Sequence, residues 1–485
     1  MSTYHDVYEA IIGLEVHMQL LTESKAYSPD ATAYGAAPNT QIDPISLGHP
    51  GTLPVPNERV TEFAVRLGTA IHADIREHNE FARKNYFYAD LPKGYQITQD
   101  TTPICTGGEI MIKDRNGEDK SIGITRIHME EDSGKSIHDL DPFNTLIDLN
   151  RAGVPLLEMV TEPVISDSQE AYNYLTEVRK LIRYLEICDG NMEEGSMRCD
   201  ANISVKRKDT DQWGTKVEVK NMNSIRNVQR ALEYEFTRQI EAIEKGETIF
   251  QETRTFDAGK GITFVMRTKE DAHDYRYFPE PDLQPIQVKQ DYVEEIRKNL
   301  PPLPNDLIKK YKEELGLSAY DAQILTDSKE TALYFEEMIR GTKNTKAAAN
   351  WLMGPIRSYL NERGIHLSDF PIKPGKIAEL IDLVDSGKVS HTAANQQIFP
   401  KLIQEPEANP TKVAEAENLI QESDTSALQE YVELAVAKFP EKVKEYQAGK
   451  KGLVGLFMGE VMKLSKGKAD PKLASQLVRE HLEKV

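Results

Sequence analysis

The amino-acid sequence predicts an α+β protein in which a mainly antiparallel sheet is followed by two all-helical domains. Two observations lead to this prediction. Short runs of alternating apolar and polar residues fill most of residues 1–290, and helical spacing takes over after the proline-rich segment 299–306. Strict alternation is typical of a strand with one buried face, because successive side chains point to opposite faces. For 485 residues we expect about three domains, with ranges 1–294, 295–410 and 411–485.

The first alternating run is IIGLEVHMQL at residues 11–20, where every even position is apolar. Its odd positions include Glu15, His17 and Gln19. A strand face that only meets water more often carries Lys, Thr or Ser. A carboxylate and an imidazole two residues apart therefore favour a metal or phosphate site. A solvated strand face is the alternative that this run alone leaves open.

Three further runs, at residues 198–205, 215–221 and 262–269, repeat the pattern. Their polar faces carry acids, amides and bases: Arg198, Asp200, Asn202 and Ser204, then Lys216, Glu218 and Lys220, then Thr263, Arg267 and Lys269. The last run opposes these with Ile262, Phe264 and Met266. If the four strands share one sheet, it has an apolar back and a front that can bind ligands.

Adjacent carboxylates stand in two segments with a Met-Glu-Glu core, at residues 127–136 and 191–200. Mg²⁺ takes oxygen ligands from one or two carboxylates, and water and phosphate complete its shell. The residues that could supply such sets are Glu15, Glu130 or Glu131, Glu193 or Glu194, Asp200 and Glu218, with His17 and His128 beside them. Reasoning from the residues leaves the choice within each adjacent pair open.

Basic residues accompany these acids, namely Arg126, Arg198, Lys220, Arg254, Arg267 and Arg276. Metal together with arginine is the usual apparatus of phosphoryl transfer. The segment DSGKS at 132–136 is no phosphate-binding loop of the P-loop type, since Met129 stands where that motif requires a glycine. A nucleotide site would have to be built from sheet residues and metal.

The segment RKNYFYADLPKGYQITQ at 83–99 places four aromatic residues among Arg83, Lys84 and Lys93. Aromatic rings beside cations can stack on a nucleic-acid base. Core packing is the alternative.

The formal net charge of −19 argues against nonspecific binding to nucleic acid. Residues 446–485 have the opposite sign, with eight Lys or Arg and four acids. No apolar run is long enough to span a membrane, and MSTYHDVYEA lacks the features of a signal peptide. Three cysteines are too few for a disulfide framework. We expect a cytoplasmic protein.

Long blocks in matching order resemble the B subunit of the bacterial and organellar glutamyl/aspartyl-tRNA amidotransferase. They include IIGLEVHMQL, PGTLPVPN, RKNYFYADLPKGYQITQ, DLNRAGVPLLEMVTEP, MEEGSMRCDANISV, EVKNMNS, QETRTFD and DYRYFPEPDL. The similarity is dense over about 1–285 and sparser through 350–354 to the tail at 449–471. It implies a catalytic cradle related in fold to glutamine synthetase, a helical domain, and a small helical tail that contacts tRNA.

The resemblance also implies a reaction and partners. A glutaminase partner, the A subunit, releases ammonia, and a small C subunit is part of the same complex. The B subunit uses ATP and Mg²⁺ to phosphorylate the side-chain carboxylate of glutamate on misacylated tRNA(Gln), or of aspartate on tRNA(Asn). Ammonia then displaces phosphate. The basic tail is expected to contact tRNA phosphates.

Transferred residue by residue, the resemblance assigns catalytic or ligand roles to part of the polar strand faces. The implied metal ligands are Glu15, His17, Glu131, Asp200 and Glu218. Glu15, His17 and Glu131 also count as catalytic, together with Lys84 and Arg198. Arg267, Lys220 and Arg276 are implied to bind the nucleotide.

One departure from the family concerns zinc. Many members carry C-x-C and C-P-x-C motifs that bind structural zinc, and the matching positions here are Ser28, Asp30, Asp43 and Ser46. Without thiolates we expect no structural zinc. Two other functions remain as alternatives: a glutamine synthetase-like ligase of a small amino acid, and a non-catalytic scaffold that presents tRNA. The carboxylate-bearing strand faces argue against the scaffold.

Overall fold

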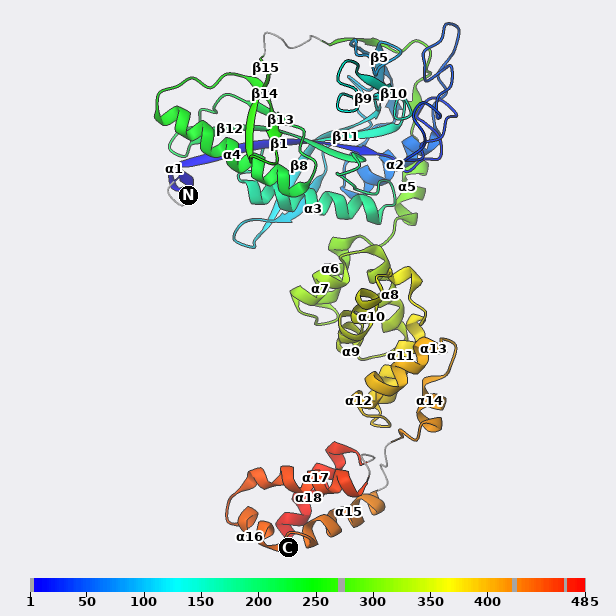
Figure 1. Ribbon diagram of the computed structural model, residues 1–485, viewed down its shortest axis with the longest axis vertical. Coiled ribbons are helices and arrows are strands. Elements are labelled where there is room, and N and C mark those ends of the chain that lie inside the picture. Colours follow the sequence, from blue (N-terminus) through cyan, green and yellow to red (C-terminus); the bar gives the residue numbers. More distant parts are fainter. Residues whose placement is uncertain (1–3, 269–274, 421–424, 466–468, 485) are drawn as a thin grey trace. The chain divides into compact units, whose positions relative to one another are not determined.

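The computed structural model describes residues 4–268, 275–420, 425–465 and 469–484. The chain divides into two compact units, Met1–Pro304 and Asn305–Val485 (Figure 1). The first unit contains the sheet, and the described part of the second is helical, which confirms the predicted α+β class. The three-domain division with boundaries at 294 and 410 stays a prediction.

The main sheet of the first unit has ten strands. In spatial order they are β15 (Ile262–Thr268), β14 (Glu252–Asp257), β13 (Val217–Lys220), β12 (Met197–Arg207), β1 (Tyr8–Gln19), β11 (Pro155–Thr161), β8 (Asp119–Glu131), β6 (Cys105–Thr106) and β2 (Asp74–Ile75), while β7 (Glu109–Lys113) also pairs with β8. Among the described strands of this sheet, β13 and β14 form the one parallel pair. The four alternating runs therefore do share one sheet.

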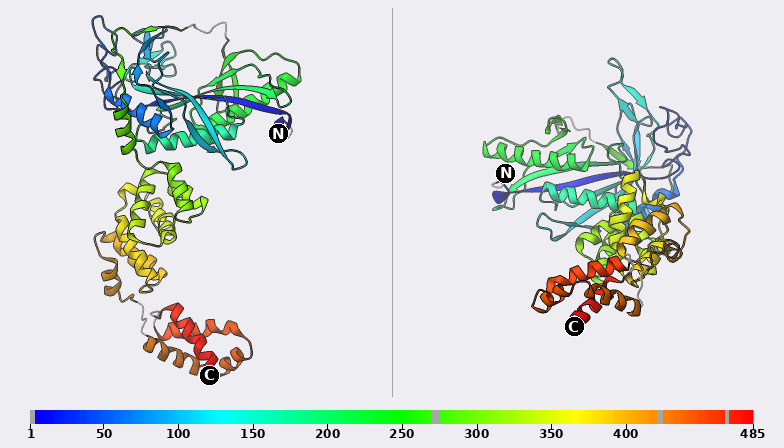
Figure 2. Two further views of the ribbon diagram at one scale, coloured as in Figure 1. Left: turned by 180° about the vertical axis from the view of Figure 1, so that it is seen from behind. Right: turned by 60° about the horizontal axis from the view of Figure 1, so that its bottom comes forward.

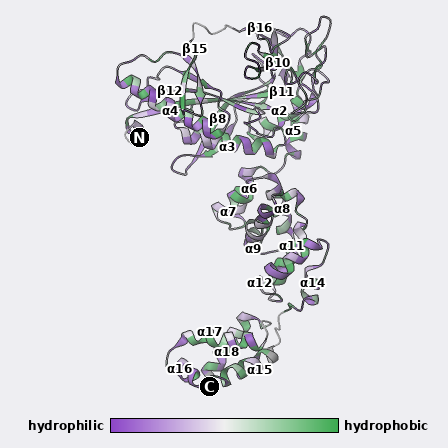
Figure 3. Ribbon diagram, viewed as in Figure 1, coloured by the Kyte–Doolittle hydropathy of each residue, from purple (hydrophilic) through white to green (hydrophobic). Residues whose placement is uncertain are grey.

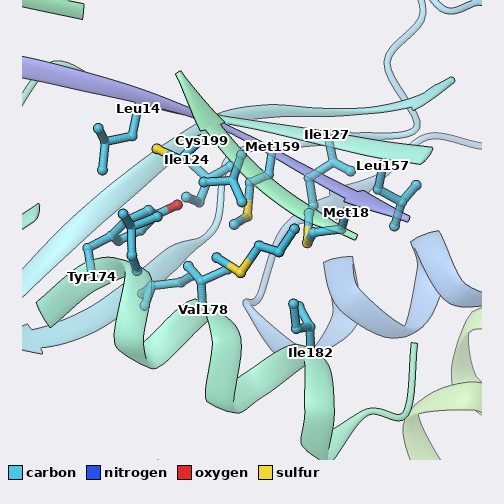
Figure 4. Close-up of a cluster of buried hydrophobic side chains, with 14 of the residues drawn as sticks. Leu14, Met18, Ile124, Ile127, Leu157, Met159, Tyr174, Val178, Ile182 and Cys199 are labelled. Atoms are coloured by element: carbon cyan, nitrogen blue, oxygen red, sulfur yellow. The ribbon is translucent and has the colours of Figure 1, made fainter. Parts of the chain in front are cut away.

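Three helices cover the first unit's core: α2 (Glu58–Ala70), α3 (Ser168–Tyr184) and α4 (Ile225–Glu244). Helices α3 and α4 lie along one face of the sheet (Figures 1 and 2). Asp167 and Ser224 cap their N-termini by accepting a hydrogen bond from a backbone amide of the first turn. Figure 4 shows Tyr174 and Val178 of α3 packed beneath apolar side chains of the strands. Burying an aliphatic side chain such as Val178 contributes roughly 1.5–3 kcal/mol.

Smaller strands lie on the other face of the sheet (Figure 1). One group joins β16 (Arg276–Pro279), β4 (Ala82–Asn85) and β5 (Tyr95–Thr98), and two pairs join β9 (Lys135–Ile137) to β10 (Leu146–Asp148) and β3 (His78–Asn79) to β17 (Ile286–Gln287). Register places Lys84, Gln96 and Tyr277 on one face of the three-stranded sheet. This face meets the main sheet, because the side chains of Gln96 and Thr98 donate to Glu130.

The prediction for β15 is wrong in one respect, since its apolar residues do not face the core. Phe264 and Met266 are half exposed, whereas Thr263 is buried. The cause lies on α4, where Glu235 accepts the Thr263 hydroxyl and pairs with Arg254 at 3.0 Å. A buried carboxylate needs polar partners, so the polar side of this edge strand turns inward.

The second unit consists of short helices with apolar and polar residues interleaved along each (Figure 3). Helix α5 (Gln290–Asn299) closes the first unit. It is followed by α6 (Pro304–Glu313), α7 (Ala319–Leu325), α8 (Lys329–Gly341), α9 (Thr345–Trp351), α10 (Arg357–Arg363), α11 (Pro374–Asp385), α12 (His391–Ala393), α13 (Phe399–Gln404), α14 (Pro410–Ala416), α15 (Thr425–Ala437), α16 (Pro440–Gln447), α17 (Val454–Leu464) and α18 (Pro471–Lys484). The last four build a core of their own around Leu428, Phe457 and Val478.

The segment 399–412 spans the boundary expected at residue 410. Helices α13 and α14 occupy both ends of that segment and leave 405–409 as the connection. Pro410 stands in the first turn of α14, where the missing N–H breaks no helical hydrogen bond. In the described part of the chain, no helix combines the length and apolar character needed to cross a membrane.

Candidate active site

The polar face of the main sheet is organised around β1. His17 lies opposite Glu158 of β11 on one side and Arg198 of β12 on the other. Glu15, two residues earlier, lies opposite Asp200 of β12. Directly opposed residues project from the same face of a sheet. The alternation seen in the first strand is therefore repeated across its neighbours, and their polar side chains converge.

The first cluster consists of His17, Glu130 and Glu158, whose ligand atoms all lie within 4.8 Å of one another. His17 Nε2 is 3.4 Å from Glu158 Oε2. Glu130 is buried and accepts the hydroxyl of Thr98 at 2.6 Å. The second group that donates to Glu130 is the Gln96 amide, at 3.2 Å. Side chains of the three-stranded sheet thus orient a carboxylate of the main sheet.

The second cluster consists of Glu15, Asp200 and Glu218, again with ligand atoms within 4.8 Å of one another. Lys220 Nζ lies 2.5 Å from Asp200 Oδ2 and 3.0 Å from Glu218 Oε1. Asn202 donates to Glu15 Oε1 at 2.9 Å. One ammonium therefore faces three carboxylates, so the cluster carries excess negative charge.

The negative charge on this sheet face changes the pKa values of acids in both clusters. Burial and the charge of Glu158 raise the pKa of Glu15, and the same two causes raise the pKa of Glu130. Burial opposes the charged form of His17, but the hydrogen bond and charge of Glu158 outweigh it and raise the His17 pKa. Burial lowers the pKa of His128 to about 4, and its buried Nε2 has no hydrogen-bond partner. Glu158 differs, because the hydrogen bond and charge of His17 outweigh its burial and lower its pKa to about 2. Glu15 and Glu130, held against their repulsion beside an unsatisfied imidazole, fit a site for divalent cations.

A polar cavity of about 550 Å³ opens over these clusters. Its walls include three basic side chains from three different strands: Lys84, Arg198 and Lys220. Arg198 donates to Asp132 at 3.0 Å, and Asp132 also accepts the Gln19 amide at 2.8 Å. The cavity therefore places cations around acidic clusters, an arrangement that can hold an anionic ligand together with its metal ions.

A smaller cavity of about 290 Å³ lies on the same sheet face, and Glu15 and Asn202 line it. The strand residue Gly13 and the loop residue Trp213 also form its walls. Trp213 is 57% exposed. The indole ring thus offers an accessible aromatic surface beside the second carboxylate cluster, which suits a planar ring system.

Some implied site residues lie elsewhere. Glu131 points to the opposite side of β8 from Glu130, where it pairs with Lys93 and accepts the amide of Ile97 at 2.8 Å. It belongs to neither cluster. Arg276 is exposed and lies opposite Asn85, on the other face of the three-stranded sheet from Lys84.

Three further candidate residues, Arg267, Glu193 and Glu194, also lie outside the two clusters as far as the structure describes them. Arg267 pairs in register with Thr253, and its side chain lies outside the described residues. Glu193 and Glu194 are exposed and belong to neither cluster. Reasoning from the sequence missed Glu158, although a single acid inside the apolar run VPLLEMV was a usable signal.

The basic tail is described in part. Lys466 and Lys468 lie outside the described residues. Lys450 is exposed and pairs with Glu445 at 3.1 Å, and Lys451 lies over the ring of Tyr446 at 4.1 Å.

Comparison with known proteins identifies the family of the chain. Residues 10–294 match the family described as GatB/GatE catalytic domain, and residues 333–482 match the one described as GatB domain. Relatives named as the B subunit of aspartyl/glutamyl-tRNA(Asn/Gln) amidotransferase include proteins of Synechococcus sp. (49% identity over 98% of both chains) and Salinibacter ruber (48% identity over 99% of this chain and 98% of the relative). The relative from Caldicellulosiruptor bescii is 47% identical over 99% of this chain and its own full length. The chain therefore belongs to the B-subunit family of aspartyl/glutamyl-tRNA amidotransferases.

Proposed function

We propose that this chain is the subunit of an amidotransferase that activates the side-chain carboxylate of misacylated Glu-tRNA(Gln), Asp-tRNA(Asn) or both. The observation that carries the proposal is the convergence of two acidic clusters on one sheet face, with three basic side chains lining the cavity above them. Family membership supplies the substrate class. The ligand sets also fit the chemistry, since a carboxylate becomes a good acyl donor only after activation.

The two clusters would hold divalent cations. The all-carboxylate set of Glu15, Asp200 and Glu218 suits Mg²⁺, and the set of His17, Glu130 and Glu158 adds one imidazole nitrogen. This choice takes Glu130 in place of Glu131, because Glu131 is already paired with Lys93. Bound cations would neutralise the phosphates of ATP and lower the charge repulsion between ATP and a substrate carboxylate.

The chain's own residues would orient the reactants. Arg198, held by Asp132, and Lys84 face the cavity and would bind the transferred phosphoryl group. A substrate carboxylate oxygen attacks the γ-phosphorus of ATP, ADP leaves, and an acyl phosphate forms. Ammonia then attacks the acyl carbon, phosphate leaves with the bonding electrons, and loss of a proton gives the amide. Burial of the cavity floor limits hydrolysis of the acyl phosphate.

The smaller cavity would take the purine of ATP. Trp213 offers a stacking surface, and Asn202 and Ser204 offer polar groups next to the second cluster. A nucleotide whose base lies there would have its phosphates directed toward Glu15, which borders both the cavity and the cluster.

Partners belong to the same proposal. Amide formation requires at least a source of ammonia, which we assign to a glutaminase partner, the A subunit, with a small C subunit in the complex. The basic residues of 446–485 would contact tRNA phosphates. Deleting residues 412–485 should raise the KM for tRNA more than it changes the use of ATP. A cytoplasmic location, where charged tRNA is available, completes the proposal.

The experiment uses the complete heterotrimer with Mg²⁺, misacylated Glu-tRNA(Gln) and radiolabelled ATP, without an ammonia source. Wild type is compared with Glu15→Gln and with the control Glu9→Gln, which changes an acid of the same strand outside both clusters. ADP formation that requires charged tRNA and is lost in Glu15→Gln alone supports carboxylate activation at this site. ADP formation without tRNA would point to a small-molecule ligase, and the absence of ADP formation by all three proteins would favour the scaffold.

A further inference from the structure

The loop between β1 and α2 gathers the four positions that match the zinc ligands of other family members. Ser46 Oγ donates to Asp30 Oδ2 at 2.6 Å and lies 2.9 Å from Ser28 Oγ. The backbone amide of Ser46 donates to Asp43 Oδ1 at 2.8 Å. Two hydroxyls and two carboxylates, already bonded to one another, do not fit a structural zinc site, which is built mainly from thiolate and imidazole.

Lys25 supplies positive charge to this cluster. Its side chain is fully buried, and its Nζ donates to the carbonyl of Gln41 at 2.7 Å and lies 3.6 Å from Asp30 Oδ2. Burial lowers the Lys25 pKa, while the charge and hydrogen bond of Asp30 oppose that effect. A buried ammonium is costly unless it is paired, so Lys25 and Asp30 depend on each other. The pair joins residues 25, 30 and 41 of one long loop.

The loop that holds these residues is attached through Gly153 to Asp132, directly after β8, the strand that carries Glu130. The amide of Ala26 donates to the carbonyl of Gly153 at 2.9 Å, and the amide of Gly153 donates to the carbonyl of Asp132 at 2.9 Å. Gly153 has φ +86°, and a Cβ there would lie 3.3 Å from Lys25 Cδ and 3.7 Å from Glu131 Oε2. The stem of Lys25 therefore packs against Gly153, next to the Glu131 carboxylate at the end of β8.

Three consecutive acids at the end of β8 and directly after it connect the site to this loop. Glu130 belongs to the first cluster, Glu131 points back toward Lys25 and Gly153, and Asp132 holds Arg198. A shift of this short segment would move a ligand carboxylate and the orientation of Arg198 together. Displacements of about 1 Å in such groups can cost roughly 100-fold in rate.

We propose that Lys25, Asp30 and Ser46 form a metal-free, noncovalent cross-link that fixes the loop between β1 and α2. Through Gly153 and Glu131, this cross-link positions Glu130 and Arg198 for the reaction. Lys25 touches no reacting group, so it is a positioning residue. The positioning role rests on the proposed function, whereas the cross-link stands on the contacts alone.

The test measures the Tm of Lys25→Met, Asp30→Asn and the double variant in the complete complex. Each single change leaves a buried group without its partner and should lower Tm by roughly 6 °C or more. The double variant removes both charges and should regain at least half of that loss. Lys260→Met is the matched control, because Lys260 also lies 3.6 Å from an aspartate but is 75% exposed. It should change Tm by less than about 1 °C.

Kinetic measurements distinguish a positioning role of Lys25 from an effect on stability alone. Below the Tm of every variant, Lys25→Met should lower kcat for amide formation roughly tenfold and leave the KM for ATP and tRNA within about twofold, with recovery in the double variant. Unchanged kcat in Lys25→Met would overturn the positioning role. Additive losses in the double variant, or stoichiometric zinc in wild type by plasma mass spectrometry, would overturn the cross-link. A wild-type complex without amidation would reject the proposed function, while the Tm pattern would still decide on the cross-link.

Discussion

Two acidic groups in the first unit differ in their charge balance. The site brings together Glu15, Glu130 and their neighbours with few cations among them, whereas Glu235 on α4 is surrounded by partners. Arg238 and Arg254 both pair with Glu235, and the Thr263 hydroxyl donates to it. Burial raises the pKa of Glu15, but at Glu235 the hydrogen bonds and charges of its partners outweigh burial and lower the pKa.

Burial of a carboxylate therefore does not by itself indicate a functional site. A carboxylate with its counter-charges in place stabilises the fold, and removing it leaves those counter-charges unpaired. Carboxylates that repel one another in the folded chain cost stability and need a ligand that supplies positive charge. Substitutions in the site should therefore lower activity more than stability, whereas substitutions around Glu235 should lower stability more than activity.

The largest effect is expected from Glu130→Gln. Glu130 belongs to the first cluster, and burial and the charge of Glu158 raise its pKa, so the amide would weaken the cluster without leaving a counter-charge unpaired. We expect tRNA-dependent amide formation to fall roughly 10³-fold, while the Tm stays within about 2 °C. Initial rates at saturating ATP and a melting curve of the same preparation measure both. A large fall in Tm with normal activity would remove the distinction between the two groups.

Glu235→Gln should show the reverse pattern. It leaves Arg254 and Arg238 without their buried counter-charge, which is expected to cost about 3–5 kcal/mol of unfolding free energy. Activity per folded molecule should be nearly unchanged, since Glu235 lies on the back of the sheet. Urea unfolding followed by circular dichroism measures the loss, and Glu233→Gln on the same helix is the control.

The same variant has a pH signature. The pKa of Glu235 in the folded chain lies below its ordinary value of 4.5, so its contribution to stability is present above that pH and is lost as the pH falls further. Wild type should therefore lose more stability than Glu235→Gln between pH 7 and pH 3. Parallel losses in the two proteins would contradict the lowered pKa.

These two groups also mark how far the sequence alone could predict the structure. Alternation predicted the strands around Glu15, Asp200 and Glu218, because a period of two indicates a half-buried strand, but it left open whether these strands share one sheet. It could not predict the inward turn of Thr263, since this depends on Glu235, a residue 28 positions away on a helix. Nor could it choose Glu130 over Glu131, which requires knowing that Lys93 reaches Glu131.

Added metal should affect the two groups differently. A cation that binds the folded site alone stabilises it by RT ln(1 + [L]/Kd), or about 2.7 kcal/mol at 100 times Kd. Mg²⁺ should therefore raise the Tm of wild type and of Glu235→Gln by similar amounts, but raise that of Glu15→Gln less. Differential scanning fluorimetry over a Mg²⁺ series, with K⁺ matched for ionic strength, measures this. Equal shifts in all three proteins would mean that Mg²⁺ acts elsewhere on the chain.

A smaller effect is expected at the cavity beside the second cluster. Trp213→Ala removes the aromatic wall and should raise the KM for ATP roughly tenfold, in line with a loss of 1–3 kcal/mol for base stacking. Trp213→Phe keeps a ring and should recover most of the affinity. The KM for charged tRNA should stay unchanged in both variants, and a change confined to it would assign the cavity to tRNA instead.

The smallest effect is expected from Glu193→Gln and Glu194→Gln. Both acids adjoin the strand that carries Arg198 and Asp200, and the sequence alone could not separate them from the cluster carboxylates. They are exposed, however, and water already solvates their charge. Removing either carboxylate therefore relieves no repulsion and leaves no counter-charge unpaired. Amidation rate and Tm should stay within twofold and about 1 °C of wild type. A strong loss of activity in either variant would show that a carboxylate can serve this site without being held in a cluster, and that charge balance is the wrong criterion.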